Sequence, residues 1–201
     1  MSPEPSQLHA LRQALERWQP LPDTAWTDLA ALFSARAVEA TEQLVTSGEC
    51  TGRFFFVTEG LLRLYYLDRE GREHNKAFTE TGGFAGAMSA YAANLPSPFN
   101  VQALQPSRVL VAHWRDLEVA YDRHPSLERL GRRFAEWLLA RKLERERAFL
   151  ELDATGRYQA FVRAHPLLED QLANYHIASY LGVTDVSLSR IRRKLRAINK
   201  G

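Results

Sequence analysis

The spacing of apolar residues divides the chain into helical ends and a middle region of short strands. Apolar residues recur every three or four positions over residues 6–19, which predicts an amphipathic helix. A second helix is expected to begin at Asp23 or Thr24, after two prolines. Between about residues 37 and 113, short segments rich in β-branched and aromatic residues alternate with turns that contain glycine. Many short strands with regular turns are typical of a β-barrel or jelly roll.

Five segments of the middle region carry the clearest strand signals. They lie at residues 53–57, 61–67, 73–78, 99–103 and 108–113. The turn Asp68–Gly71 should join the second and third segments as a hairpin, with glycine where a positive φ is needed. The last two segments are expected to pair with each other across residues 104–107.

A long helix is expected after this region. A short helix should begin near His113–Leu117 and stop at His124–Pro125, and Ser126 is expected to cap the long helix that follows. The apolar face of that helix consists of Leu127, Leu130, Phe134, Trp137 and Leu138. A small barrel alone cannot cover such a stripe over about 25 residues, which leaves apolar surface for a further contact. The alternative is that the stripe packs only on its own barrel.

The segment 172–196, LANYHIASYLGVTDVSLSRIRRKLR, has the pattern of two short helices around a tight turn. Gly182 stands where the chain must turn, because glycine accepts positive φ readily. Thr184 is placed to cap the second helix. Apolar residues at helical spacing form an inner face: Ile177, Ala178, Leu181, Leu188, Ile191, Leu195 and Ile198. Basic and hydroxyl side chains occupy the opposite face, and together these features predict a helix-turn-helix.

The stretch HIASYLGVTDVSLSRIRRKL resembles the recognition motif of the Crp/Fnr family of bacterial transcription regulators. A weaker resemblance covers nearly the whole chain, including EGLLRLYYLDREGREHNKAF and GRYQAFVRAHPLL. It implies an α+β fold with an N-terminal cyclic-nucleotide-binding-like β jelly-roll barrel, a long dimerisation helix and a C-terminal winged helix-turn-helix. The implied domains are a sensor domain at 1–125, the dimerisation helix at 126–152 and the DNA-binding domain at 153–201.

The resemblance also implies which residues face DNA. A homodimer would place the helix 184–196 of each copy in the major groove of a palindromic operator. Arg190 matches the arginine that relatives use on guanine, whose O6 and N7 accept two parallel N–H groups. Asp185 and Val186 stand where the cyclic-AMP receptor has Arg and Glu, so a different half-site is expected. The remaining candidates for DNA contact are Ser187, Ser189 and Arg193, and Thr184 is expected to cap the helix.

The region that binds the cyclic phosphate in the cyclic-AMP receptor differs in this chain. Gly86 is retained, but Ala87 stands where that receptor has the glutamate for the ribose hydroxyl. No basic residue occurs between Lys76 and Arg108, so a cyclic phosphate has no guanidinium partner there. Tight binding of cyclic AMP is therefore not expected. Another apolar or neutral ligand near Gly86, Ala87, Met88, Tyr91 and Phe99 is one expectation, and a filled barrel that serves as a scaffold is the other.

Charge is distributed unevenly along the chain. The whole chain has a net charge of only +2, yet residues 157–201 contain eight Lys or Arg against three Asp or Glu, a net of +5. A basic end on a mildly acidic body is typical of proteins that bind a polyanion such as DNA. A solvated charged helix is the alternative interpretation of the same charges.

Composition and motifs argue against several other classes of protein. The single cysteine, Cys50, cannot form an internal disulfide or hold an iron–sulfur cluster alone. No apolar run approaches the roughly 18 residues that a membrane span needs, and the N-terminus lacks a secretory signal pattern, so a cytoplasmic protein without membrane contact is expected. The six histidines are scattered, and no catalytic motif, metal site or cofactor is predicted. The rival to a DNA-binding regulator is a small-molecule-sensing barrel that acts through protein contacts.

Overall fold

A computed structural model describes residues 1–198 of the chain, which form two compact units. Unit 1 comprises residues 1–67 and 76–136, and unit 2 comprises residues 68–75 and the chain from residue 137 onward. The boundary at Glu136 falls inside a single continuous helix, α5 (Pro125–Glu151). The short segment 68–75 is the turn region that precedes and begins a strand of the barrel, yet it packs with the C-terminal helices.

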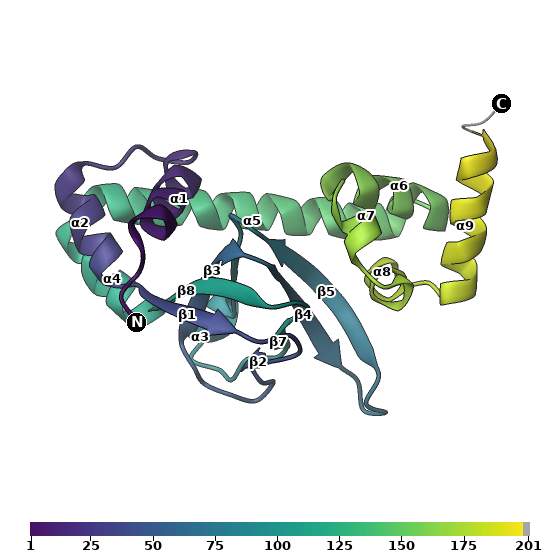
Figure 1. Ribbon diagram of the computed structural model, residues 1–201, viewed down its shortest axis with the longest axis horizontal. Coiled ribbons are helices and arrows are strands. Elements are labelled where there is room, and N and C mark those ends of the chain that lie inside the picture. The colour runs from purple at the N-terminus through teal and green to yellow at the C-terminus, as the bar shows by residue number, and fades with distance from the viewer. Residues whose placement is uncertain (199–201) are drawn as a thin grey trace. The chain divides into compact units, whose positions relative to one another are not determined.

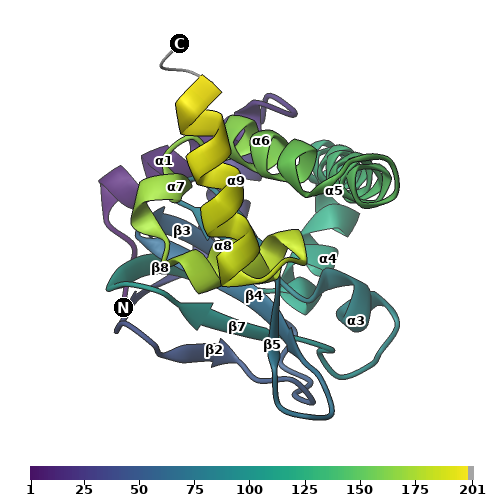
Figure 2. The ribbon, with the colours of Figure 1, turned by 90° about the vertical axis from the view of Figure 1, so that its right-hand side faces the viewer.

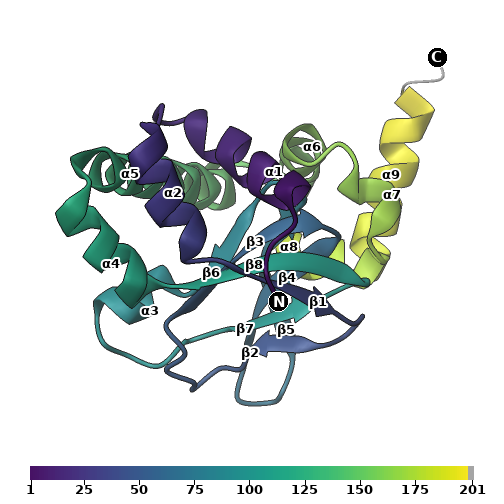
Figure 3. The same cartoon turned by 60° about the vertical axis from the view of Figure 1, so that its left-hand side comes forward.

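The strands of the described chain form two four-stranded sheets. One sheet has the strand order β1-β8-β3-β6 and the other has the order β2-β7-β4-β5. The strands are β1 (Ser34–Val38), β2 (Gln43–Val45), β3 (Arg53–Glu59), β4 (Leu61–Leu67), β5 (Glu73–Glu80), β6 (Phe84–Gly86), β7 (Asn100–Ala103) and β8 (Ser107–His113). Figure 1 labels each of them except β6, which is labelled in Figure 3. This arrangement confirms the predicted α+β fold with an N-terminal β-barrel domain.

The predicted pairing of the segments at 99–103 and 108–113 is wrong. β7 pairs with β2 and β4, whereas β8 pairs with β1 and β3 in the other sheet. The short connection at residues 104–106 carries the chain from one sheet to the other, so strands that are adjacent in sequence are not adjacent in space. The hairpin predicted at Asp68–Gly71 does join neighbouring strands, β4 and β5.

Alternate residues of β3 point into two separate cores. Phe55 and Val57 lie in the interior between the two sheets, together with Leu62, Val101 and Val109. Phe54 and Phe56 lie on the other face, under α1 (Pro5–Glu16), α2 (Asp23–Ala31), α4 (Trp114–Arg123) and the start of α5. Figure 3 shows α1, α2 and α4 together on that side of the sheet. This two-residue alternation is the expected pattern for a strand buried on both faces.

The long helix differs from prediction at its start and along its apolar face. It begins at Pro125, so Ser126 lies inside the first turn instead of capping it; proline is well suited to the first helical position. Leu127 and Leu130 are buried in the core of unit 1, and only later apolar residues of the helix are exposed.

Unit 2 is helical after residue 137. Beyond the end of α5 it contains α6 (Ala154–Ala164), α7 (Leu168–Gln171), α8 (Asn174–Leu181) and α9 (Asp185–Ile198). The expectation of a winged motif is corrected here, because no strand occurs between residues 137 and 198. Only a short helical segment, α7, connects α6 to α8, which leaves no room for a β-hairpin there. The side chain of Ile198 lies outside the described part of the chain.

Candidate DNA-binding interface and barrel cavity

The turn between α8 and α9 has the geometry that its sequence predicts. Gly182 has a φ of 67°, in the left-handed region, and the N–H of Val183 donates to the carbonyl of Ala178 at 3.0 Å. A Cβ at position 182 would also come within 3.2 Å of the Phe149 ring. Thr184 Oγ1 accepts a hydrogen bond from the N–H of Ser187 at 3.2 Å, which confirms that Thr184 caps α9.

The inner faces of the two helices are buried as predicted. The buried residues are Ile177, Ala178, Leu181, Leu188 and Ile191, and Leu195 is half-buried. Tyr158 and Phe161 of α6 complete the apolar core of unit 2. The crossing of α8 and α9, which Figure 2 shows as ribbons, is therefore fixed by side-chain packing, and the opposite face of α9 is exposed.

The residues predicted to meet DNA lie on one exposed face at the start of α9. Asp185, Ser189 and Arg193 follow one another at four-residue spacing, and Val186 and Arg190 run beside them. All five are exposed, Val186 by 60%. Within residues 1–198 none of the five makes a side-chain hydrogen bond or ion pair. Ser187 is half-buried, and its hydroxyl lies 3.0 Å from the hydroxyl of Thr184.

One basic residue of α9 has a structural role that sequence reasoning did not assign. The guanidinium of Arg192 donates to the hydroxyl of Tyr158, to the backbone carbonyl of Glu169 and to the side chain of Asn174. It also forms an ion pair with the Glu169 carboxylate at 3.5 Å. Arg192 thus ties α9 to three other helices of unit 2. Its spacing from Leu188 and Leu195 places it at the edge of the inner face, which is the signal that could have found it.

Two arginines hold the C-terminal end of α8. Arg145 Nη2 donates to the carbonyl of Tyr180 at 3.1 Å, and Arg157 Nε donates to the carbonyl of Leu181 at 3.1 Å. Both guanidinium groups also lie over the ring of Phe149, at 5.2 and 5.0 Å from its centroid. Cationic groups at a helix C-terminus satisfy its last carbonyls and complement its dipole, so these contacts anchor α8 to α5 and α6.

The segment 68–75 contacts α8 within unit 2. The hydroxyl of Ser179 accepts a hydrogen bond from the N–H of Asn75 at 2.9 Å and donates to the carbonyl of Glu73 at 3.0 Å. Arg145 reaches the carbonyl of Asn75 at 3.5 Å. The first helix of the motif is therefore bound to a segment that lies about 100 residues earlier in the sequence.

The five residues predicted near a barrel ligand are separated in unit 1. Phe99 is buried in the barrel interior, which the two sheets fill with apolar side chains. Gly86 ends β6, and Met88 begins the short helix α3 (Met88–Ala92). Ala87 and Tyr91 line a cavity of about 270 Å³, on the side of α3 that faces the loop before β3. The other lining residues are Glu49, Cys50, Thr51, Gly52, Arg53, Ala90, Asn94, Leu95, Ser97, His113, Trp114 and Arg115.

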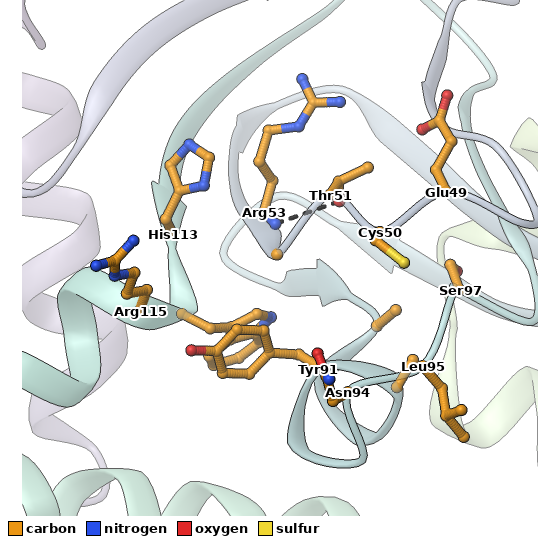
Figure 4. A pocket seen from close by; sticks show the side chains of 14 residues that line it. Glu49, Cys50, Thr51, Arg53, Tyr91, Asn94, Leu95, Ser97, His113 and Arg115 are labelled. Atoms are coloured by element: carbon orange, nitrogen blue, oxygen red, sulfur yellow. Dashed lines mark hydrogen bonds between the residues drawn. The ribbon is translucent and has the colours of Figure 1, made fainter.

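Backbone hydrogen bonds join the segments that form this cavity. The N–H of Trp114 donates to Gly52, and the N–H of Ser97 donates to Glu49, each at 2.9 Å. The hydroxyl of Tyr91 donates to the Glu118 carboxylate at 2.8 Å, and this hydrogen bond raises the pKa of Tyr91 because it stabilises the protonated phenol. In Figure 4 the side chains of His113 and Arg115 lie on one side of the cavity and Cys50 on the other.

The described residues contain neither a candidate metal site nor a membrane-spanning helix. Residues 1–198 contain no group of three or more His, Cys, Asp or Glu side chains placed to hold a metal ion. In the same part of the chain, no helix combines the length and apolar character that a bilayer-crossing segment requires.

Comparison with known proteins finds a family whose model resembles the middle part of the chain. Residues 35–124 match the cyclic nucleotide-binding domain family. No curated protein sequence matches the chain. The matched residues carry the two sheets described above.

Solved structures of Crp/Fnr-type regulators share the fold of the chain. FixK2 from Bradyrhizobium japonicum has a TM-score of 0.69 at 21% identity, covering 83% of this chain and 86% of its own. The c-di-GMP-responsive regulator CLP from Xanthomonas campestris has a TM-score of 0.68 at 14% identity, covering 89% and 93%. A CooA mutant from Carboxydothermus hydrogenoformans has a TM-score of 0.67 at 17% identity, covering 94% and 84%.

Proposed function

We propose that the chain is a bacterial DNA-binding transcription regulator of the Crp/Fnr type, not an enzyme, and that it acts in the cytoplasm. The observation that carries this proposal is the exposed face of α9, where Arg190 and Arg193 have no partner within residues 1–198. Arg190 is long enough and free enough to present two N–H groups to one guanine. Val186 offers an apolar contact for a thymine methyl, and Asp185 sits in the first turn of α9, where a carboxylate suits the helix dipole.

The regulator binds its operator as a homodimer, and the second half of α5 is the contact between copies. Leu139, Leu143 and Leu150 lie on one stripe of this helix, at spacings of four and seven residues. They are exposed by 56%, 56% and 81% in the single chain. Three leucines with this exposure favour pairing with a second helix, because the pairing removes their apolar surface from water.

Cyclic AMP is not its effector. The interior of the barrel is filled by Phe55, Phe99 and neighbouring apolar side chains. The methyl side chain of Ala87 offers no acceptor for a ribose hydroxyl. The segment between Lys76 and Arg108, which corresponds to the phosphate-binding segment of the cyclic-AMP receptor, contains no cation. Isothermal calorimetry of the full chain with cyclic AMP is expected to show no binding in the micromolar range, and a micromolar dissociation constant would refute this part of the proposal.

In-vitro selection of DNA by the purified chain tests the main proposal. The wild type should enrich a palindromic site with half-sites about one helical turn apart. Arg190→Ala should lower affinity by roughly 1–3 kcal/mol and relax the preference at one base pair of each half-site. Arg163→Ala, which removes an exposed arginine of α6, is the matched control and should leave the selected sequence unchanged.

Two outcomes would contradict this assignment. If Arg190→Ala weakens binding to every sequence equally, Arg190 contacts phosphate and does not read a base. If the wild type enriches no sequence and binds only weakly in a salt-sensitive manner, sequence-specific recognition by the chain alone is excluded. A barrel protein that acts through protein contacts would then be the better description.

A further inference from the structure

The cavity beside α3 carries positive charge that the protein itself does not neutralise. Within residues 1–198, Arg115 makes no hydrogen bond or ion pair, and Arg53 makes only a 3.4 Å side-chain hydrogen bond, to the carbonyl of Leu44. The one carboxylate in the lining, that of Glu49, accepts a hydrogen bond from the N–H of Thr46 at 3.1 Å. Unpaired guanidinium groups in a concave site favour a ligand with a carboxylate or phosphate.

The backbone brings the cationic groups to one side of the cavity. Arg53 on β3 and His113 on β8 are direct partners in the register of neighbouring antiparallel strands. Directly opposed residues of such a pair project from the same face of the sheet. Arg115 follows two residues later, in the first turn of α4, so strand pairing and helix geometry together place three basic side chains at this wall.

Aromatic rings provide a second wall. The rings of Tyr91 and Trp114 lie 6.4 Å apart and are inclined by only 29°. Trp114 in turn stacks on Phe54 at 4.3 Å and 27°, which holds its ring in place from the barrel side. The Tyr91 ring is fixed at its other end by the hydrogen bond to Glu118. Fixed, nearly parallel rings favour stacking or edge contact with a planar ligand.

The size of the cavity limits the ligand to a small molecule. A buried cavity of about 150 Å³ accommodates benzene, and this cavity measures about 270 Å³. One aromatic ring, an acidic group and a short substituent would fill it. Because the walls are already joined by hydrogen bonds, the cavity needs little ordering when a ligand enters.

We propose that this cavity is a binding site for a small aromatic acid, a single ring that carries one carboxylate or phosphate group. The acid pairs with Arg115 and Arg53, and the ring lies against Tyr91 and Trp114. The site lies outside the filled barrel interior and involves residues of unit 1 only. Binding here does not depend on whether α9 contacts DNA, so it can be tested separately from the DNA-binding function.

Cys50 provides a direct measurement, because it is the only cysteine of the chain, is exposed and lines the cavity. The full-length protein is treated with iodoacetamide, an uncharged thiol reagent, in the presence of benzoate or phenyl phosphate. Both anions should slow alkylation of Cys50 in a saturable manner. Benzamide tests the need for the charge, and inorganic phosphate tests the need for the ring; each should protect far less.

The Arg115→Gln variant tests the charge pairing. Arg115 is exposed and makes no hydrogen bond or ion pair within residues 1–198, so this variant should fold normally. The concentration of benzoate for half-maximal protection should rise roughly tenfold or more, the usual effect of losing a hydrogen bond to a charged group. Arg123→Gln removes an exposed arginine of α4 that does not line the cavity, and it should leave protection unchanged.

The indole N–H resonance of Trp114, assigned with Trp114→Phe, gives a second readout of the same titrations. The site is refuted if benzoate and phenyl phosphate alter neither the alkylation rate nor this resonance. Equal protection by benzamide would refute the role of charge, and equal protection by inorganic phosphate would refute the aromatic class of ligand. Unchanged half-maximal protection in Arg115→Gln would refute the assigned pairing.

Discussion

The side-chain amide of Asn75 donates a hydrogen bond to the backbone carbonyl of His176, 101 positions later in the chain, at 3.0 Å. The same Nδ2 atom lies 3.2 Å from Nδ1 of the His176 ring. Both residues are buried, and Asn75 Oδ1 has no hydrogen-bond partner within the described residues. The side-chain amide of Asn75 is thus one of the groups of the segment 68–75 that hold the first helix of the helix-turn-helix.

Asn75→Ala should lower the free energy of unfolding of unit 2 by about 1–3 kcal/mol, because it removes a buried hydrogen bond to the carbonyl of His176. Asn75→Asp should cost more than Asn75→Ala, since a carboxylate cannot donate and would face the carbonyl oxygen of His176. Urea denaturation followed by circular dichroism measures both changes. Gln171→Ala, at an exposed position of α7, is the control. Equal stability of the wild type and both Asn75 variants would show that this contact does not contribute.

The cap at Thr184 gives a prediction about α9 itself. Thr184→Ala removes the acceptor for the Ser187 N–H and should destabilise unit 2 by about 1 kcal/mol. Thr184→Ser keeps the hydroxyl and should retain most of the stability. Thermal unfolding of the three proteins under identical conditions makes the comparison. If Ser and Ala substitutions are equally costly, the methyl group of Thr184 and not its hydroxyl is the stabilising part.

Introducing a charged side chain into α5 tests the proposed dimer contact. Leu143→Lys places an ammonium group in the middle of the proposed seam and should convert the wild-type dimer to a monomer in sedimentation velocity runs. Leu167→Lys alters another leucine of unit 2, 65% exposed but outside α5, and should remain dimeric. A monomeric wild type, or a dimeric Leu143→Lys protein, would exclude this seam.

The contacts of Asp68 in the hairpin turn predict that the stability of the hairpin depends on pH. Hydrogen bonds from His74 and then from Arg72 lower the pKa of Asp68 well below its usual value. A carboxylate with a lowered folded-state pKa stabilises the hairpin above its unfolded pKa of about 3.9, and this contribution is lost as the pH falls through the folded pKa. Carbon NMR titration should find Asp68 still ionised at about pH 3.

His74→Ala and Arg72→Ala should each raise the pKa of Asp68 in that titration, with the larger change in His74→Ala. Arg69→Ala, which removes a neighbouring guanidinium that does not bond Asp68, should leave the pKa nearly unchanged. A pKa for wild-type Asp68 at its unfolded value would show that the turn contacts do not persist in solution.

Local signals explain which parts of the fold could be predicted from sequence. The β4–β5 hairpin follows from the glycine at position 71, and the helix-turn-helix follows from Gly182, Thr184 and the spacing of apolar residues around them. The pairing of β7 and β8 was wrong because the choice of sheet depends on contacts between distant strands, which adjacency in sequence does not reveal. The prediction of a wing rested on the family resemblance alone, and the described part of unit 2 after residue 137 contains no strand that could form one.

The α9 face and the cavity of unit 1 also differ in how far the sequence could predict them. The exposed face of α9 lies within nine consecutive residues, so helical periodicity was enough to find it. The cavity of unit 1 combines three separate segments, around Arg53, Tyr91 and Arg115, which only the folded barrel brings together. Arg115 carries no distinguishing signal in the sequence, because an exposed arginine after a strand is common.

The exposed face of α9 has a consequence for how this protein can change through evolution. The residues that hold the helix, such as Leu188 and Arg192, are distinct from the outward residues Asp185, Val186 and Arg190. Substitutions at the outward positions remove no packing and should alter stability by less than about 0.5 kcal/mol. Under the proposed function, a lineage can therefore exchange one operator for another by single mutations, without first acquiring compensating changes in the fold.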